Sequence, residues 1–384
     1  MPMRAVSTRA VPMRAVPARR MCVRLDLAPR PRRSRLMEAL SPALAFALAV
    51  AIGGLAVAAM GRSPAAAFAI YFVAPLTEFW SLQEVALKAA PLALIATGLA
   101  FCYRANLWNI GAEGQFVIGG LAGGCIAVAT HGIEGGPLGT SWILPAMLAA
   151  GTLAGMAYAL IPAILRVALG VSEILTSLML VYVAELLLDY LVRGPLRDPA
   201  GYNFPQSVGF DDAARLAPLI EGENLHAGVL IALAVVLLAV VVLSRTLFGF
   251  RVRVVGAAPR AARFAGFSEA RLTLAAFAVS GGAAGLAGIA EVAGRIGQLQ
   301  PSISPGYGFT AIIVAFLGRL SPIGIALASL VIALTTIGAE GAQIALKLPL
   351  DLTRAFQGLL LALVLGADVL ARYRVRLVPG GRAA

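Results

Sequence analysis

The chain has 384 residues, of which 60% are hydrophobic and only 13% are charged. Soluble globular domains carry about 25% charged residues, so this chain has too few to cover a water-facing surface. A lipid-facing surface removes that requirement, because the bilayer core favours apolar side chains around an internally satisfied backbone. The net charge is +12. In a membrane protein such an excess orients the helices, so nucleic acid is not an expected partner.

Several enzyme classes are excluded by motifs that the sequence lacks. A phosphate-binding P-loop needs Gly-Lys followed by Ser or Thr, and neither Lys88 nor Lys347 follows a glycine. Two histidines and three scattered cysteines exclude a histidine-rich metal site and disfavour a disulfide framework. The chain is therefore expected to have no ATPase activity, catalytic residue, metal or cofactor of its own.

The first segment, residues 1–35, contains ten arginines and is predicted to be a disordered basic tail. Met13, Met21 and Met37 are alternative start positions, and the tail is also suited to binding an anionic membrane surface. A signal peptide is the other interpretation. The apolar run at 39–60 is longer than the usual apolar region of 7–15 residues in such peptides, which favours an uncleaved first membrane span.

Ten apolar runs approach the roughly 20 residues that a helix needs to cross a bilayer. They lie at 39–60, 86–103, 111–130, 142–165, 171–192, 227–244, 272–294, 307–318, 322–345 and 353–371. The predicted fold is an all-α polytopic membrane protein with about ten transmembrane helices. A single transmembrane domain over 36–376 is followed by a C-terminal tail, 377–384.

The distribution of basic residues predicts the orientation. If the N-terminus is cytoplasmic and ten spans alternate, 23 of the 31 basic residues fall on the cytoplasmic side. Cytoplasmic loops of membrane proteins carry an excess of Lys and Arg, so both termini are predicted to be cytoplasmic. One span more or fewer would place the basic tail and the basic loop 245–271 on opposite sides, which favours an even number.

Two connections are long enough to have functions of their own. The outer loop 193–226 is acidic and rich in Pro and Gly, and either contacts an external partner or is a solvated cap. In the inner loop 245–271, Pro259 suits the first turn of a helix and Gly266 suits its end. This loop is either an ordinary cytoplasmic connection or a short basic helix on which a motor subunit docks.

Polar residues within the apolar runs are candidates for a transport path, since intramembrane charges often mark one. Asn109 and Glu113 lie in NIGAEGQ, and Glu173, Thr176 and Ser177 share one face of a predicted helix. These side chains either line a passage or bond one helix to another. Pairs of glycines four residues apart predict close helix packing: Gly119/Gly123, Gly120/Gly124, Gly151/Gly155 and Gly281/Gly285.

Four separated blocks carry a family resemblance. They read LIATGLAFCYRANLWNIGAEGQFVIGG at 94–120, GVSEILTSLMLVYVAELLLDYLVRGPLRDP at 170–199, FRVRVVGAAPRAARFAGFS at 250–268 and PGYGFTAIIVAFLGRLSPIGI at 305–325. The sequence resembles permease subunits of bacterial ABC importers for nucleosides and simple sugars, within the branched-chain amino acid and ribose permease group.

The resemblance implies a multi-pass protein of the bacterial cytoplasmic membrane that forms the path for a nucleoside or simple sugar. It also implies three partners: an ATP-binding cassette subunit that uses ATP and magnesium, a related but shorter second permease, and an extracytoplasmic substrate-binding lipoprotein. The block at 250–268 matches the family's cytoplasmic coupling segment. The positions expected to dock the ATPase are Gly256, Pro259, Ala262, Arg263 and Gly266, and those expected near the path are Asn109, Glu113, Glu173, Thr176 and Ser177.

The sequence departs from the family pattern at three positions near the expected path. Ser172 and Val181 stand where relatives commonly have asparagine, and Trp108 stands where they commonly have phenylalanine, which puts the usual specificity in question. The alternative function is a secondary transporter driven by an ion gradient, with Glu113 or Glu173 as the coupling carboxylate. The docking-like loop 245–271 disfavours that alternative, because such a carrier needs no motor subunit.

Overall fold

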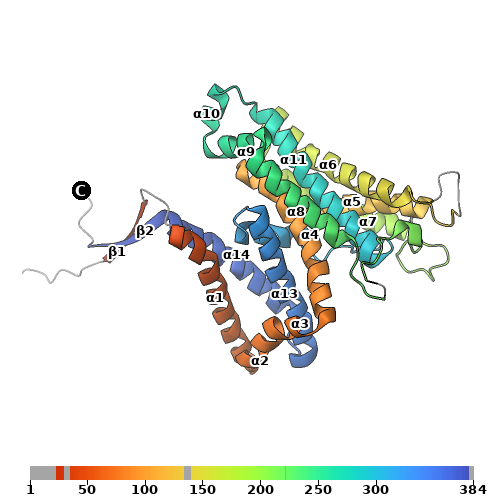
Figure 1. Ribbon diagram of the computed structural model, residues 1–384, viewed down its shortest axis with the longest axis horizontal. Coiled ribbons are helices and arrows are strands. Elements are labelled where there is room, and N and C mark those ends of the chain that lie inside the picture. Colours follow the sequence, from red (N-terminus) through yellow and green to blue (C-terminus); the bar gives the residue numbers. More distant parts are fainter. Residues whose placement is uncertain (1–22, 30–34, 134–139, 221, 380–384) are drawn as a thin grey trace, which may run out of the picture.

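The structure, a computed structural model, describes residues 23–29, 35–133, 140–220 and 222–379. In this part the chain forms a bundle of long helices with a two-stranded sheet at one side (Figure 1). The bundle consists of α4 (Phe79–Arg104), α5 (Ala112–Ala129), α6 (Ile143–Leu169), α7 (Glu173–Arg193), α8 (Gly228–Arg245), α11 (Glu269–Glu291), α12 (Tyr307–Leu317) and α13 (Pro322–Leu346). The flanking helices are α1 (Arg35–Ala59), α2 (Pro64–Phe68), α3 (Ala74–Thr77) and α14 (Leu350–Arg372).

Each of the ten apolar runs of the sequence falls in a helix. Among the described residues, seven helices are long and apolar enough to cross a membrane: α4, α5, α6, α7, α8, α11 with the π-helical turn η3 (Val292–Ile296), and α13. Shorter apolar helices cover Ala43–Ala59, Pro64–Thr77 and Tyr307–Leu317. The chain is therefore a polytopic helical membrane protein.

The helical connection between α1 and α4 is an element that the sequence did not predict. It runs through α2, the π-helical turn η1 (Ala69–Val73) and α3, and begins where the Ser63 hydroxyl accepts a hydrogen bond from the Ala66 amide. The connection packs on α13 so closely that a Cβ on Gly338 would lie 2.2 Å from the Tyr71 carbonyl oxygen. Its apolar stretch is too short to register as a span, which is why a length criterion misses it.

Glycines hold α5, α6 and α11 together, as their spacing predicts. A Cβ on Gly119 would lie 2.3 Å from the Gly285 Cα, and one on Gly155 would lie 2.3 Å from the Gly281 carbonyl oxygen. Helix association in lipid depends on van der Waals packing, so residues without side chains allow these backbones to touch. The three helices lie side by side in Figure 1 and form the tightly packed part of the bundle.

A small sheet joins the two ends of the described chain. Strand β1 (Val23–Pro29) pairs antiparallel with β2 (Tyr373–Pro379). An all-α prediction did not include it, and β1 lies in the segment predicted to be a disordered tail. Both strands alternate apolar and polar residues, the pattern of a half-buried strand, but they are too far apart in sequence for a local reading to pair them. The rest of the tail, 1–22 and 30–34, and the end of the chain, 380–384, lie outside the described residues.

The bundle has two distinct ends. At one end, the Arg104 guanidinium donates to the Leu320 carbonyl oxygen at 2.9 Å, and the connection after α8 folds into α9 (Leu247–Ala257) and α10 (Pro259–Phe264). At the other end, the segment 194–227, which includes the short helix η2 (Asp212–Ala214), packs on η3, where the Leu216 amide donates to the Ala293 carbonyl oxygen at 3.0 Å. We call these the α9–α10 end and the loop end.

Two non-helical segments lie between helices of the bundle. Residues 105–111 separate α4 from α5, and residues 297–306 separate η3 from α12. α12 has 11 residues, about 16 Å at 1.5 Å per residue, or roughly half of a hydrocarbon core about 30 Å thick. Irregular backbone at membrane depth is tolerated only where protein buries it or where it lines a cavity, so these segments direct attention to what surrounds them.

Candidate functional site

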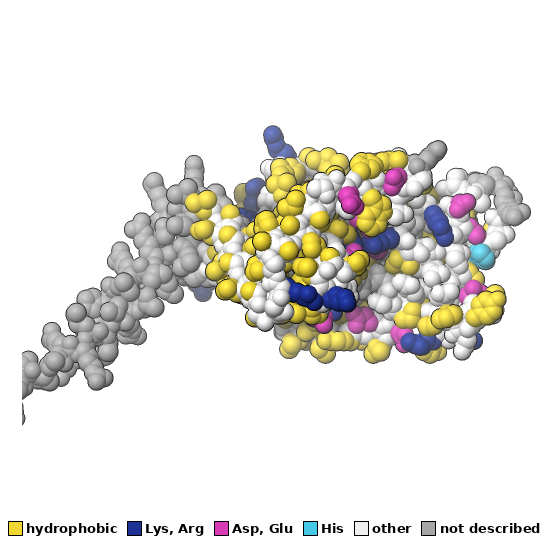
Figure 2. All heavy atoms as spheres, turned by 90° about the horizontal axis from the view of Figure 1, so that it is seen from below, with side chains coloured by type: hydrophobic (Ala, Val, Ile, Leu, Met, Phe, Trp, Pro, Cys, Tyr) yellow, Lys and Arg dark blue, Asp and Glu magenta, His cyan; other side chains and the backbone are white. Residues whose placement is uncertain are grey.

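A cavity of about 920 Å³ opens where the loop-end halves of several helices meet. Its volume lies in the roughly 300–1,000 Å³ range of small-molecule sites. α4, the end of α11 with η3, the segment before α12, α12 itself, α13 and α14 all contribute to its wall. The polar lining residues are Lys88, Glu291, Arg295, Gln300, Ser302, Ser304, Tyr307, Thr310, Thr336, Glu340, Thr353, Arg354 and Gln357. In the space-filling view (Figure 2), acidic and basic side chains are interspersed on a mainly hydrophobic face.

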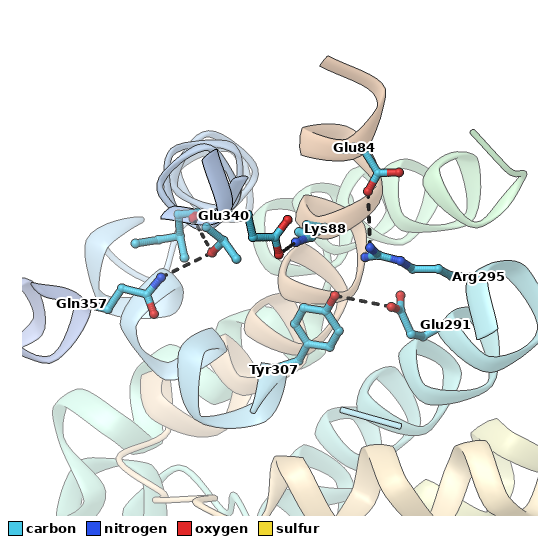
Figure 3. A network of polar contacts seen from close by, with 9 residues as sticks. Glu84, Lys88, Glu291, Arg295, Tyr307, Glu340 and Gln357 are labelled. Atoms are coloured by element: carbon cyan, nitrogen blue, oxygen red, sulfur yellow. Dashed lines mark hydrogen bonds and ion pairs between the residues drawn. The ribbon is translucent and has the colours of Figure 1, made fainter. Parts of the chain in front are cut away.

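Two ion pairs tie the outer part of α4 to its neighbours at the cavity (Figure 3). The Lys88 ammonium pairs with the Glu340 carboxylate of α13. One turn earlier, the Glu84 carboxylate lies 3.4 Å from the Arg295 guanidinium of η3. Because positions four apart lie on one helix face, α4 presents one acidic and one basic group to the same side. Both groups of α4 are nearly buried, with side chains 8% and 7% exposed.

A third polar contact joins α11 to the start of α12. The Tyr307 hydroxyl donates to the Glu291 carboxylate at 3.4 Å, and both residues are buried. Across the cavity, the Gln357 amide of α14 donates to the Thr336 hydroxyl of α13 at 3.4 Å. Figure 3 shows these groups converging from several helices on a common space.

Such a concentration of buried charge is a functional signal. Removing ions from water costs several kcal/mol for each ion, and their mutual attraction only partly offsets that cost. Apolar side chains of similar size would often stabilise the bundle better. Charged groups within membrane helices therefore mark a solute or ion pathway by default.

The non-helical segment 297–306 forms one wall of the cavity. Gly306 has a φ of +100°, a conformation that glycine adopts without a steric penalty. The Ser304 hydroxyl accepts hydrogen bonds from the Gly306 and Tyr307 amides, both at 3.1 Å, and so caps the start of α12. A broken helix whose unwound part faces a cavity is the usual way in which transporters expose polar backbone within a membrane.

His226, just before α8, packs against η3 behind the wall residue Arg295. Its imidazole is packed against Gly294, where a Cβ would lie 2.3 Å from the ring, and its Nδ1 accepts from the Gly228 amide at 3.2 Å. Burial, with the nearby positive charge of Arg295, lowers the pKa of His226 to about 4. The ring is therefore neutral at pH 7, and it packs beside η3 without repelling Arg295.

Of the residues predicted near a path, Asn109 is completely buried in a hydrogen-bonded network. Its amide nitrogen donates to Gln115 at 2.9 Å and to Ser280 at 3.0 Å. Its amide oxygen accepts from the Gly111 amide and from Gln115, both at 3.0 Å. All four hydrogen-bonding positions of the side chain are occupied, and Asn109 anchors the segment 105–111 between α5 and α11.

Glu113 has a comparable structural setting. Its side chain is buried at the start of α5, and its carboxylate accepts a hydrogen bond from the Gly308 amide in the first turn of α12. Amide groups at a helix N-terminus carry partial positive charge, which a carboxylate stabilises. The contact therefore joins the two helices that follow the two non-helical segments.

The α7 residues of the predicted path bond to their surroundings in the same way. Glu173 pairs with Arg166 of α6 and accepts from the Trp108 amide at 3.3 Å. The Ser177 hydroxyl accepts from the Ile110 amide at 3.2 Å, and Thr176 donates to the Ser172 carbonyl oxygen in its own helix. None of the five predicted path residues lines the cavity described above. A direct contact with solute stays a prediction.

The residues predicted to dock an ATPase lie together at the α9–α10 end. Gly256 is in direct contact with the end of α4, since a Cβ there would lie 1.9 Å from the Arg104 carbonyl oxygen. Pro259 occupies the first turn of α10, and Ala262 is buried beneath it. Thr246 caps the start of α9 by accepting from the Gly249 amide at 3.2 Å.

The outer face of α10 carries the remaining predicted positions. Arg263 forms an ion pair with Glu269 of α11 at 2.9 Å, and Gly266 ends the helix with a φ of +76° and no atom within 4 Å of an added Cβ. Phe264, which the sequence analysis did not select, is 95% exposed. Large aromatic side chains are enriched at the energetic centres of protein interfaces, so Phe264 adds an anchor to the basic surface.

Sequence reasoning missed most of the charged cavity. Glu291 and Glu340 lie within the apolar runs 272–294 and 322–345, and Lys88 and Arg295 lie near the ends of two runs, but none of the four was selected for the path. The available signal was Glu84 with Lys88, two opposite charges one turn apart at the start of an apolar run. Their partners on η3 and α13 are about 200 and 250 residues away and share no local pattern with them.

These features define a class of protein. A helical membrane bundle with a polar, charge-lined cavity at one end and an exposed basic helix pair at the other is built as a transport subunit that a partner drives. The model of the family described as "Branched-chain amino acid transport system / permease component" matches residues 81–365. The chain belongs to this family, and it is the membrane-spanning permease subunit of an ABC importer.

Curated relatives agree with this assignment over most of their lengths. The chain is 40% identical to the glucose ABC transporter permease of Haloferax volcanii over 92% of this chain and 94% of that protein. It is 27% identical to the guanosine ABC transporter permease of Bacillus subtilis over 90% and 97%. It is 26% identical to a nucleoside ABC transporter permease of Lactococcus lactis over 80% and 85%. No solved structure matches the chain.

The family confirms the resemblance on which the sequence analysis relied. Permeases of this kind have no ATPase motif, and a partner subunit hydrolyses the ATP. The alternative of a secondary carrier driven by an ion gradient is therefore set aside. That the basic loop 245–271 docks the ATPase subunit stays a prediction.

Proposed function

We propose that this permease forms the import path for a neutral, hydrophilic solute, a simple sugar or a nucleoside, across a bacterial cytoplasmic membrane. The observation that carries the proposal is the placement of the two sites. The polar cavity lies at the loop end, and the exposed α9–α10 pair lies at the opposite end. A solute would enter the cavity from outside, while ATP-driven motion would reach the bundle from inside.

The proposed orientation has both termini in the cytoplasm and ten membrane-inserted helices. α1, α12 and α14 would join the seven helices that are long and apolar enough to cross a membrane, with α12 spanning only half of the bilayer. Two observations support this topology. Positive charge is concentrated at the α9–α10 end, and β1 pairs with β2, which requires the segments before α1 and after α14 to lie on one side.

The proposed coupling route runs through α4. The contact between Gly256 and the Arg104 carbonyl oxygen leaves no space between α9 and the end of α4. From Arg104, α4 (Phe79–Arg104) runs back without interruption to Lys88 and Glu84, a distance of about 24–30 Å along its axis. A displacement of α9 and α10 would therefore reach the cavity through one continuous helix.

Three partners are part of the proposal. An ATP-binding cassette subunit, which binds ATP and magnesium, would dock on α10 around Phe264. A second, related permease would complete the path, because a solute channel between helices needs a wall that this chain alone does not close. An extracytoplasmic binding protein, which in such importers is usually a lipoprotein, would deliver solute to the loop end.

The solute class follows from the relatives and from the cavity. The relatives are permeases for glucose, guanosine and nucleosides, which are neutral solutes rich in hydroxyl groups. Hydroxyl, amide and paired charged groups line the cavity, and such groups exchange hydrogen bonds with sugar hydroxyls. The higher identity to the glucose permease favours a sugar.

The test is reconstitution of the complete importer in proteoliposomes. The permease, together with the ATPase, second permease and binding protein encoded beside it, should accumulate radiolabelled glucose or guanosine only with enclosed ATP and magnesium. Uptake should need no ion gradient. Accumulation driven by a sodium or proton gradient without ATP would refute the proposal, as would ATP hydrolysis by the purified permease alone.

A further inference from the structure

Every basic side chain that lines the cavity has an acidic partner. Lys88 pairs with Glu340, Arg295 with Glu84, and Arg354 with Asp351 at 3.2 Å. Glu291 is a further acidic group on the wall, and it receives the hydroxyl of Tyr307. Three basic and four acidic side chains are thus present at the cavity, and no basic group there is left to attract an anion.

Of the three ion pairs, Lys88–Glu340 has the largest difference in exposure between its two partners. The lysine side chain is only 7% exposed, whereas the glutamate side chain is 49% exposed. Among the described residues, the Lys88 ammonium, which has three donors, donates one hydrogen bond, to the Glu340 carboxylate. The lysine therefore lies in the cavity wall with unused donors, and the glutamate stands on the open side as its counter-charge.

The chemistry of this pair distinguishes neutral solutes from anions. A sugar hydroxyl accepts from an ammonium and donates to a carboxylate, so it can bind between Lys88 and Glu340 without displacing either. A phosphate group would gain the attraction of Lys88 but would meet repulsion from Glu340 at short range. In a partly desolvated cavity, that repulsion is much stronger than it would be in water.

We infer that Glu340 is a specificity-determining residue that holds Lys88 neutralised and so restricts the cavity to neutral solutes, excluding their phosphorylated forms. Lys88 is the donor that contacts the solute. This inference rests on the proposed function, in which the cavity is part of the import path. It adds that the cavity discriminates by charge independently of any delivering protein.

The experiment measures how strongly a phosphorylated competitor inhibits uptake. Proteoliposomes with the complete importer and enclosed ATP take up guanosine or glucose, and external guanosine 5′-monophosphate or glucose 6-phosphate is titrated. In Glu340→Gln, Lys88 loses its counter-charge, so the half-inhibitory concentration of the monophosphate should fall at least tenfold. Competition at the binding protein is the same for every variant, so the ratio to the unaltered importer isolates the cavity.

Two further variants separate selectivity from structural damage. Asp189→Asn removes a carboxylate from the Asp189–Arg193 pair of α7, which lies outside the cavity, and it should leave inhibition unchanged. The double variant Lys88→Gln with Glu340→Gln removes the unpaired ammonium, so it should lose the new sensitivity. Equal inhibition of Glu340→Gln and the unaltered importer overturns the inference, and so does sensitivity that persists in the double variant.

A direct binding measurement keeps the test decisive if Glu340→Gln does not transport. Calorimetric titration of the purified permease–ATPase complex with the monophosphate should show binding to Glu340→Gln and none to the unaltered complex. Absence of binding to Glu340→Gln contradicts the inference. Failure of the unaltered importer to take up either neutral solute would instead refute the proposed function, and calorimetry would still decide the role of Lys88.

Discussion

The two ends of this permease carry charge in opposite ways. At the α9–α10 end, six basic residues lie in the single segment 245–271, and the partner of Arg263, Glu269, is only a few residues along the chain. At the loop end, acidic and basic groups from α4, η3 and α13 are paired across large sequence separations. The first arrangement suits attachment of another protein, and the second suits passage of an uncharged solute.

This difference explains how each end is held in place. α10 is a short element whose geometry follows from local signals, a proline at its start and a glycine at its end. The cavity exists only after the whole bundle has packed, because its groups come from α4, α11, η3, α12, α13 and α14. Substitutions at the α9–α10 end should therefore affect partner binding and coupling, whereas substitutions at the cavity should affect which solute is transported.

The largest expected effect is at the contact that connects the two ends. Gly256→Val places side-chain atoms where the Arg104 carbonyl oxygen lies 1.9 Å from an ideal Cβ. Overpacking of a tight contact costs about 1–3 kcal/mol, and here it shifts α9 away from α4. We expect uptake by the reconstituted importer to fall by about tenfold or more while membrane insertion, measured by immunoblot of membranes, stays normal.

Gly366→Val is the matched control for that change. Gly366 lies in α14 with nothing within 4 Å of an added Cβ, so the same substitution should leave uptake near its usual value. Normal uptake in Gly256→Val would show that motion does not enter the bundle through this contact. Equal loss in both variants would show only that the bundle tolerates no added volume.

The sequence predicted the helical segment 245–271 but did not predict the contact of Gly256 with Arg104. The segment 245–271 was assigned to coupling, and Gly256 was selected, but its neighbour Arg104 lies about 150 residues earlier. The ten helices were visible because apolar length is a local property. The cavity was not visible, because Lys88 and Glu340 become neighbours only through packing. Asn109 and Glu113 were noticed for their polarity, which serves helix-to-helix bonding in the structure.

A smaller effect is expected at the exposed face of α10. Phe264→Asp replaces a 95% exposed aromatic ring with a charge, and loss of an interface anchor typically costs 2 kcal/mol or more. Affinity for the ATPase subunit should therefore fall by about thirtyfold, as measured by titration of the detergent-solubilised permease. Stability of the permease alone should not change, because the Phe264 side chain is almost fully exposed.

Tyr202→Asp provides the comparison between the ends. Tyr202 is 94% exposed, but it lies in the segment 194–227 at the loop end. The same chemical change there should leave ATPase binding unaltered. Weakened binding in both variants would mean that the ATPase subunit does not distinguish the two ends, and the assignment of α10 as its docking helix would be wrong.

The smallest expected change tests whether the predicted path residues act on solute or on the fold. Asn109→Ala leaves Gln115, Ser280 and the Gly111 amide without their partner. Burying unsatisfied polar groups costs about 1–3 kcal/mol, so the thermal unfolding midpoint of the purified permease should fall by several degrees.

The kinetics of uptake decide between the two roles of Asn109. If Asn109 is purely structural, its replacement lowers the amount of active importer and leaves the KM for solute unchanged. Thr176→Val is the control, since its hydroxyl bonds only within α7, and an exposed change of this kind is usually worth less than about 0.5 kcal/mol. A tenfold rise in KM without loss of stability in Asn109→Ala would return the path to α5 and α7. In that case Asn109 would act on the solute, and the charged cavity would have a structural role instead.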